Sequence, residues 1–247
     1  MSQITLAEYI WIDGTNPVPL IRSKAKVVQT NANTTIESFP EWSFDGSSTN
    51  QASGNNSDCI LKPVNFVKDP IRGENNYLVL CEVYNPDGTT HSSNTRSILR
   101  KYLDTGGIKE DPWIGFEQEY TLYYKGKPLG WPDSGYPAPQ GPYYCGVGAE
   151  QVSGRDLVEA HAKACLDAGL MLYGVNAEVM LGQWEFQVGY RGIDNEKVDA
   201  LTICDHLWIT RWLFYRIAEE ADVEVRLDNK PVKGDWNGAG MHTNFST

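Results

Sequence analysis

The chain has 247 residues, of which 41% are hydrophobic and 11% aromatic, enough to build one large domain or two smaller ones. Its formal net charge of −11 would repel phosphate backbones, which argues against nucleic acid as a partner. Residues 1–11 lack a charged segment followed by an apolar one, and no long apolar run appears later. We therefore expect neither a signal peptide nor a membrane span.

The first third of the chain is predicted to consist of short strands and turns. Residues 8–14 and 21–28 are expected to be strands around a turn, and the strongly apolar residues 77–84 to be another strand. The polar stretch 42–58 is rich in Gly, Ser and Asn, and we expect it to be a loop.

A helix is predicted between Ser93, which can cap it, and Gly106, which can end it. Its apolar stripe would be formed by Ile98, Leu99, Tyr102 and Leu103. We expect this helix to mark the boundary between two domains, residues 1–89 and 94–247.

The remainder of the chain alternates predicted strands and amphipathic helices. A strand at 113–122 leads into a long loop rich in Pro and Gly, of a length that is usually functional or forms a covering flap. The later elements are a helix at 154–170, strands at 175–180 and 183–189, a helix at about 203–220, and strands at 223–228 and 241–245.

Acidic, amide and imidazole side chains share faces of these strands. Residues i and i+2 of a strand point the same way, about 6.5–7 Å apart at the backbone. Glu117 and Glu119 therefore share a face, as do His242 and Asn244. A third polar face carries Gln183, Glu185 and Gln187, and Glu178 lies at the end of the strand before it.

Such polar faces cannot be buried without partners, because burying an unpaired charge costs several kcal/mol or more. They therefore either point to water or line one cleft in which cations neutralise the carboxylates. The strands are apolar and aromatic enough to be central in a sheet, which favours the cleft. Carboxylates with one imidazole suit Mg²⁺ or Mn²⁺. Each signal is weak alone: His161 is expected to be structural, His91 and His206 belong to no cluster of candidate ligands, and Asp45 could simply form an Asx-turn. Together the signals favour a metal site without naming a reaction.

The five cysteines are scattered, and none forms a C-x-x-C pair, which is typical of reduced thiols in a cytoplasmic protein. The sequence also lacks G-x-x-x-x-G-K-[ST] and a G-x-G-x-x-G after a strand. If a nucleotide binds, its phosphates would be held mainly by metal ions and arginines. The Gly-rich stretch 236–240 permits close approach of the backbone to a ligand, or serves only as a tight turn.

Five stretches closely resemble the glutamine synthetases of the eukaryotic-type class (class II): WSFDGSST, GFEQEYTL, GWP…YPAPQGPYYCGVG, NAEVMLGQWEFQVG and GDWNGAGMHTNFST. They follow the order of that family and span nearly the whole chain. The resemblance implies an α+β protein with an N-terminal β-grasp domain, followed by part of a catalytic domain built from an antiparallel sheet with helices. It also implies ATP-dependent ligation of ammonia to L-glutamate through γ-glutamyl phosphate, a step of glutamine biosynthesis and nitrogen assimilation.

The resemblance also assigns the site. Glu119, Glu178 and Glu185 match the ligands of one Mg²⁺ or Mn²⁺ ion, and Glu117 and His242 match ligands of a second. Asp45 would come from a neighbouring subunit to bind ammonium and take its proton, with Tyr144 lining that site; Asn237 and Gly238 would bind glutamate. The residues matching the ATP-binding segments are Glu117, Glu185, Phe186, Gln187, Val188, Gly189, Tyr190, Asn244, Phe245 and Ser246.

Family members are homo-oligomers, and two stacked five-membered rings are expected for this class.

The family's pattern continues past Thr247, with phosphate-binding arginines, a further metal-binding glutamate and a flap. We therefore expect this chain to be a fragment that is inactive alone. Leu181, where a proline is usual, and an enlarged segment at 191–204 are smaller departures. The alternatives are a non-catalytic structural or regulatory relative, a γ-glutamyl-amine ligase, and, from the residues alone, a metal-dependent hydrolase.

Overall fold

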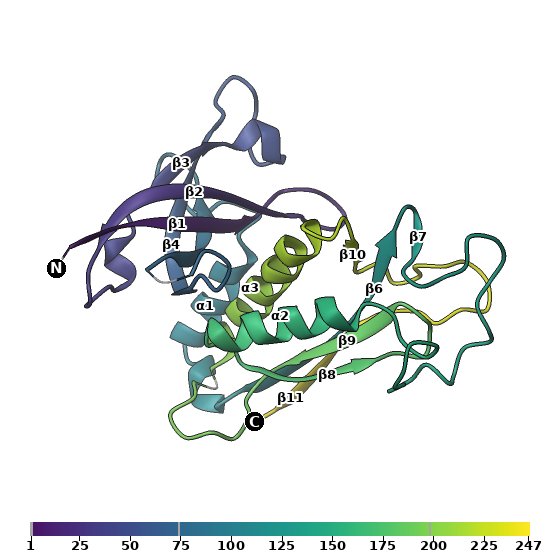
Figure 1. The fold of residues 1–247 in the computed structure, drawn as a ribbon. Helices are drawn as coiled ribbons and strands as arrows, with labels where there is room; N and C mark the ends of the chain where they lie inside the picture. Colours follow the sequence, from purple (N-terminus) through teal and green to yellow (C-terminus); the bar gives the residue numbers. More distant parts are fainter. Residues whose placement is uncertain (1, 74, 198) are drawn as a thin grey trace. The chain divides into compact units, whose positions relative to one another are not determined.

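The computed structural model describes residues 2–73, 75–197 and 199–247, and the chain divides into two compact units, Met1–Asp111 and Pro112–Thr247 (Figure 1). Each unit contains its own sheet. Residue 198, inside the enlarged segment 191–204, lies outside the described residues. None of the helices in the described part of the chain combines the length and apolarity that a bilayer-spanning helix requires.

The first unit is built on a five-stranded sheet in the order β2-β1-β5-β4-β3. The strands are β1 (Gln3–Ile12), β2 (Ile21–Thr30), β3 (Trp42–Asp45), β4 (Asp58–Lys68) and β5 (Tyr77–Tyr84). β1 and β5 pair in parallel, and the other neighbours are antiparallel. Aromatic and aliphatic side chains, such as those of Tyr9, Trp11, Leu61 and Val79, form a core against this sheet.

Short helices connect and follow these strands. They are the 3₁₀ helices η1 (Ile36–Ser38), η2 (Gly46–Thr49) and η3 (Gly107–Glu110), and the α-helix α1 (Thr95–Asp104). The helix near 93–106 is thus confirmed, but Asn94 rather than Ser93 caps it, accepting the N–H of Ser97 at 3.1 Å. The predicted stripe is only partly correct: Leu103 is buried, whereas Ile98 and Tyr102 are exposed in this unit.

The prediction of a loop over residues 42–58 is wrong at its start, where β3 forms, and β4 was not predicted at all. β3 has only four residues, too few for alternation to stand out from the Gly/Ser/Asn-rich composition that follows it. β4 contains Pro63, and its pairing with β5 shifts register between Pro63 and Asn65, which interrupts the alternation expected of a strand.

The second unit contains an antiparallel sheet centred on β6 (Trp113–Tyr124). β9 (Gln183–Val188) pairs with one edge of β6, and β8 (Leu172–Ala177) pairs with β9. The remaining strands β7 (Lys127–Pro128), β10 (Glu224–Arg226) and β11 (Met241–Ser246) each pair with β6. The predicted antiparallel sheet with helices is therefore confirmed.

Helices α2 (Arg155–Asp167) and α3 (Ala200–Glu219) cover one face of this sheet (Figure 1). Tyr120 of β6 contacts Phe214 of α3 edge-on, with ring centroids 4.7 Å apart, and Phe186 of β9 contacts His161 of α2 at 5.3 Å. Because side chains alternate along a strand, Glu117, Glu119 and Glu185 point to the opposite face. The predicted division into apolar and polar faces is thus confirmed for β6 and β9.

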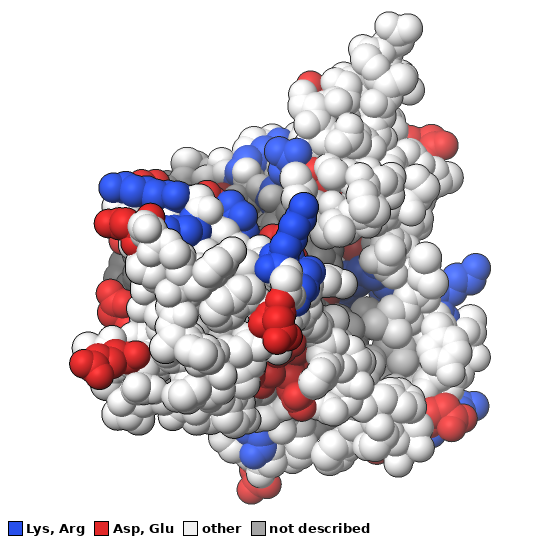
Figure 2. Space-filling view, turned by 90° about the vertical axis from the view of Figure 1, so that its right-hand side faces the viewer, with Lys and Arg blue, Asp and Glu red and all other residues white. Residues whose placement is uncertain are grey.

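The prediction that all three polar strands are central is wrong for β11. Within the described residues β11 pairs only with β6, and the ring of Phe245 is 65% exposed. On the face drawn in Figure 2, side chains of both signs of charge lie on a mostly uncharged surface.

Candidate active site

Three glutamates converge on the face of the second sheet opposite the helices. Glu119 and Glu185 are directly paired across the β6–β9 ladder, and Glu178 follows the end of β8. One carboxylate oxygen of each lies within 4.8 Å of the other two. Oxygens on opposite sides of a divalent cation are about 4–5 Å apart, because each metal–oxygen distance is about 2.0–2.6 Å. The three oxygens therefore have the spacing of ligands to one shared ion.

A small network of neutral side chains orients two of these carboxylates. Asn176 donates from Nδ2 to Glu178 Oε1 at 3.1 Å, and the N–H of Val179 donates to Glu178 Oε2 at 3.2 Å. The amide of Gln187 donates to Glu185, and also to Asn176 Oδ1 at 2.6 Å. These amides fix the geometry of the carboxylates without neutralising their charge.

Burial and mutual repulsion both act on the cluster. Burial raises the pKa of Glu178, and the negative charges of Glu119 and Glu185 raise it further. Burial also raises the pKa of Glu185, with added repulsion from Glu117 and Glu119. A divalent cation bound here would reverse both effects, because it favours the ionised carboxylates. The donor set therefore fits a hard divalent metal ion.

Glu117 and His242 lie beside this cluster as a pair. They are opposite each other across the β6–β11 ladder, with 3.2 Å between His242 Nδ1 and Glu117 Oε2. Asn244 donates from Nδ2 to Glu117 Oε1 at 2.7 Å. Two protein ligands leave most positions of an octahedral ion open to water or substrate oxygens.

The glutamate-binding turn predicted at Asn237 and Gly238 is bonded to the sheet. Gln183 of β9 accepts from Asn237 Nδ2 at 2.7 Å and donates to the Gly238 carbonyl at 2.8 Å. Two residues further on, Gly240 donates its N–H to Glu119 Oε2 at 2.6 Å. The turn and the carboxylate cluster are therefore parts of one hydrogen-bonded assembly.

The long Pro/Gly-rich loop contributes to the same turn. Gln140 accepts the backbone N–H of Asn237 at 2.8 Å. Trp131 and Tyr136 pack their rings against Trp236, with centroids 4.7 Å and 5.7 Å away. No sequence pattern singles out Gln140 or Asn176, because their roles depend on contacts between distant segments.

Tyr144 in this loop is exposed, and the charges of the acidic cluster affect the pKa of its phenol. The neighbouring Cys145 raises the pKa of Tyr144 most, and the charges of Glu178 and Glu185 add to this. The phenol therefore stays protonated near neutral pH and can act as a hydrogen-bond donor near the glutamates.

Asp45 lies in the first unit, at the end of β3, where it caps η2. Ser47 donates to Oδ1 from its backbone N–H at 3.0 Å and from its hydroxyl at 2.6 Å, and Ser48 donates its hydroxyl to Oδ2 at 2.8 Å. The hydroxyls of Ser47 and Ser48 lower the pKa of Asp45. The result is an exposed, oriented carboxylate that stays ionised and suits a small cation.

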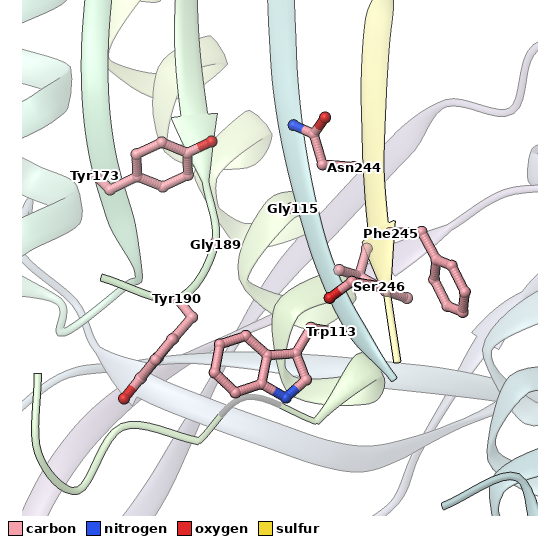
Figure 3. A pocket seen from close by; sticks show the side chains of 9 residues that line it. Trp113, Gly115, Tyr173, Gly189, Tyr190, Asn244, Phe245 and Ser246 are labelled. Atoms are coloured by element: carbon pink, nitrogen blue, oxygen red, sulfur yellow. The ribbon is translucent and has the colours of Figure 1, made fainter. Parts of the chain in front are cut away.

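A pocket of about 250 Å³ opens on the second unit where β6 begins and β9 and β11 end (Figure 3). It is lined by Trp113, Ile114, Gly115, Tyr173, Gly189, Tyr190, Asn244, Phe245 and Ser246. Tyr173, Tyr190 and Trp113 present aromatic rings around it, and the Phe245 ring lies on the other side of β11 from Asn244 (Figure 3).

Five of the residues predicted to bind nucleotide line this pocket, namely Gly189, Tyr190, Asn244, Phe245 and Ser246. The side chains of Phe186 and Val188 are instead buried on the helix-covered face. Only the main chain of those two residues could therefore reach a nucleotide. Glu117, Glu185 and Gln187 belong to the carboxylate assembly.

His161 has a structural environment, as predicted. It is fully buried, stacks on Phe214 with centroids 4.1 Å apart, and its Nε2 donates to the Thr210 carbonyl at 3.0 Å. Burial lowers its pKa to about 4, so it is neutral at physiological pH.

Comparison with known families accounts for both units. Residues 3–86 match the glutamine synthetase β-Grasp domain, and residues 92–247 match the glutamine synthetase catalytic domain. The chain belongs to the glutamine synthetase family. The expected α+β fold, a β-grasp domain followed by catalytic-domain structure, is thereby confirmed.

Individual glutamine synthetases are similar to this chain over nearly its whole length. That of Streptomyces viridochromogenes is 58% identical over 241 residues, covering 98% of this chain and 68% of the relative. Those of Frankia alni and of Chlamydomonas reinhardtii, the latter named chloroplastic, are 54% and 52% identical and are each covered to 64%. The chain thus spans about two thirds of the length of these relatives. A cryo-EM structure of Plasmodium falciparum glutamine synthetase matches with a TM-score of 0.72 at 18% identity, covering 97% of this chain and 50% of that one, which shows the shared fold.

Proposed function

We propose that the protein ligates ammonia to L-glutamate with ATP, giving L-glutamine, ADP and phosphate through γ-glutamyl phosphate. The observation that carries the proposal is the convergence of Glu119, Glu178 and Glu185 within 4.8 Å, in a chain of the glutamine synthetase family. Phosphoryl transfer from ATP to a carboxylate brings two anions together, so positive charge must stabilise the transition state. A cluster of carboxylates can supply that charge by binding divalent metal ions.

In this proposal Glu119, Glu178 and Glu185 hold one Mg²⁺ or Mn²⁺ ion, and Glu117 and His242 supply ligands to a second. Bound ions would neutralise the charges of the substrate carboxylate and of the ATP phosphates. The chain's own part is geometric: the amides of Asn176 and Gln187 keep the carboxylates oriented before substrate arrives.

Glutamate is proposed to bind at the Asn237–Gly238 turn. Gln183 fixes the orientation of the Asn237 amide, and Gly240 connects the turn to Glu119. This connection would place the substrate's side-chain carboxylate beside the acidic cluster, where it can receive the phosphoryl group.

Asp45, from a neighbouring subunit, is proposed to bind ammonium and to accept one proton from it. Ammonium has no lone pair on nitrogen until it loses that proton, so the transfer precedes attack. The NH₃ so formed then bonds to the carbonyl carbon of γ-glutamyl phosphate, the C–O bond to phosphate breaks, and a proton of the added nitrogen leaves with the phosphate. The lowered pKa of Asp45 suits the first task, because it keeps the carboxylate ionised for cation binding. Tyr144 is proposed to line the same ammonium site.

ATP is proposed to place its base in the 250 Å³ pocket beside Tyr173 and Tyr190, with Asn244 to Ser246 along one side. Aromatic faces favour stacking of a planar base, and the glycines at 115 and 189 allow close approach.

The proposal includes a homo-oligomer, because Asp45 is assigned to a site shared with a second subunit. Two stacked five-membered rings are the form that the resemblance to the family implies. We also infer a cytoplasmic location, which is supported by the five cysteines being free.

The test is to incubate the protein in its assembled form with glutamate, ammonium, ATP and Mg²⁺, and to measure glutamine and phosphate separately. Equal amounts of the two, abolished in a Glu119→Gln variant, are expected. Phosphate release without glutamine would indicate a hydrolase, and a preference for a primary amine over ammonium would indicate a γ-glutamyl-amine ligase.

A further inference from the structure

Gln51 closes the segment that carries Asp45. Its backbone N–H donates to the Gly46 carbonyl at 2.8 Å, which closes the turn formed by η2. Its buried side chain donates to the Ile12 carbonyl at 3.2 Å and accepts the Thr49 hydroxyl at 2.9 Å. The C-terminal end of η2 is thereby attached to the body of the first unit.

His91 completes a closed ring of hydrogen bonds with Gln51 and Ser93. His91 Nε2 lies 2.6 Å from the Gln51 carbonyl oxygen, and Gln51 Nε2 donates to the Ser93 hydroxyl at 2.8 Å. That hydroxyl lies 2.8 Å from His91 Nδ1, which also accepts the Ser93 backbone N–H at 3.1 Å. Each residue of the ring contacts the other two.

The chemistry of the partners fixes the tautomer of His91. A carbonyl oxygen can only accept, so Nε2 must carry the proton. A backbone N–H can only donate, so Nδ1 must be unprotonated. His91 is therefore neutral in this ring and has a single orientation.

We propose that His91 is a positioning residue for the ammonium site, acting through Gln51 and η2 on Asp45. This inference rests on the proposed function of Asp45. The serines that orient the Asp45 carboxylate, Ser47 and Ser48, both belong to η2, and the hydrogen-bonded ring immobilises the end of η2 opposite to Asp45.

The need for such an anchor follows from the size of η2. A 3₁₀ helix of four residues has poor hydrogen-bond geometry and little stability of its own. It is followed by Asn50 in the left-handed region, at φ 58°, a conformation that surrounding contacts must maintain. Displacing a catalytic group by about 1 Å can reduce turnover about 100-fold, so a loosened η2 would be visible in ammonium use.

The test compares three variants of the assembled protein. His91→Ala removes both ring contacts, and His91→Gln retains one N–H donor and one acceptor. Ser92→Ala, at the exposed neighbouring residue, is the matched control. For each we would measure the KM values for ammonium, glutamate and ATP, and the rate with hydroxylamine, a neutral nucleophile near pH 7 that needs no proton removed before attack.

His91→Ala is expected to raise the KM for ammonium about tenfold and to leave the KM values for glutamate and ATP within about twofold. Hydroxylamine should be used nearly as well as by the natural protein, and His91→Gln should restore most of the ammonium affinity. Unchanged ammonium kinetics, or an equal loss with ammonium and hydroxylamine, would overturn the positioning role.

Amide hydrogen exchange separates this inference from the proposed function. Ala52 donates its N–H to the Gly46 carbonyl at 3.1 Å, so its exchange reports the closure of η2. Even if the natural protein forms no glutamine, faster exchange at Ala52 in His91→Ala supports the anchoring of η2. Unchanged exchange there overturns it.

Discussion

Glu119 and Glu185 face each other directly across the β6–β9 ladder, and both are drawn close to Glu178. Like charges at directly opposed positions destabilise a sheet. The β6–β9 pairing is therefore held against local repulsion by the apolar packing of Tyr120 and Phe186 on the other face. A divalent cation at this site, as proposed above, would relieve that repulsion.

Addition of Mg²⁺ or Mn²⁺ should accordingly raise the melting temperature by several degrees. Saturation at 100 times Kd contributes about 2.7 kcal/mol. In Glu185→Gln the metal-free protein should melt at the same or a higher temperature, because one of the mutually repelling charges is gone, and the metal-induced shift should fall by more than half. Differential scanning fluorimetry measures both.

Glu150→Gln is the control, since Glu150 is exposed and outside the cluster. It should leave the metal-induced shift unchanged. An equal metal response in Glu185→Gln and the natural protein would show that Glu185 is not a ligand.

The polar faces of β6 and β9 could be predicted because the two-residue period of a strand is a property of the local chain. Glu117, Glu119 and Glu185 needed only that period. Their convergence with Glu178 could not be predicted from alternation, because Glu178 lies after the end of β8 and its position depends on the turn and the register with β9. The resemblance to a family supplied that grouping.

Other contacts of the site could not be predicted from local sequence patterns either, because they join segments that are far apart in the chain. The N–H of Gly240 reaches Glu119, a residue 121 positions earlier in the chain, only because β11 pairs with β6. The ring of His91, Gln51 and Ser93 joins segments 40 residues apart, and no periodic pattern marks it. The central position expected for β11 was wrong because the alternation of a strand is the same at an edge as in the centre of a sheet.

Asp45→Asn should leave the protein folded and able to bind metal, but should reduce kcat/KM for ammonium about 100-fold or more. The amide oxygen can still accept the hydrogen bonds from Ser47, and the amide nitrogen can donate to the Ser48 hydroxyl, but the side chain has no charge for ammonium and cannot take its proton. Hydroxylamine should be affected much less. Steady-state assays with the two nucleophiles provide the comparison.

Asp58, paired with Asp45 across the β3–β4 ladder and also exposed, offers a matched control. Asp58→Asn removes an equal charge from the same surface and should change ammonium use less than about threefold. If both variants lose ammonium use equally, general surface charge rather than a specific role of Asp45 is responsible.

Tyr190→Ala should raise the KM for ATP about tenfold, because stacking of a base on an aromatic ring contributes about 1–3 kcal/mol. Tyr190 packs edge-on against Trp113, with centroids 5.0 Å apart, so both rings would shape the base site. Leu166→Ala, an exposed apolar change on α2 outside the pocket lining, is the control. An effect of Leu166→Ala as large as that of Tyr190→Ala would place the base elsewhere.

Glu82 is a buried carboxylate with several hydrogen-bond partners, and it connects β5 to α1. Its side chain is 1% exposed and accepts from Arg96 at 2.7 Å and Arg100 at 3.2 Å. Tyr84 and Asn94 donate to it as well, at 2.9 Å and 3.2 Å. Removing the charge takes the ionised half of both ion pairs away inside a buried network, so Glu82→Gln should lower the free energy of unfolding by about 2–4 kcal/mol. Chemical denaturation at pH 7 would measure this loss.

The loss should depend on pH in a defined way. Burial by itself would raise the pKa of Glu82, but the hydrogen bonds from Arg100 and Arg96 outweigh it and lower the pKa from 4.5 to about 2. The unfolded state therefore takes up a proton first as the pH falls. The difference in free energy of unfolding between the natural protein and Glu82→Gln should be complete above pH 4.5 and should disappear as the pH falls through about 2.

Asp104→Asn, an exposed change at the end of α1, is the control and should show no such dependence on pH. A difference between Glu82→Gln and the natural protein that stayed constant from pH 6 down to the acid limit would mean that ionised Glu82 does not hold α1 in place.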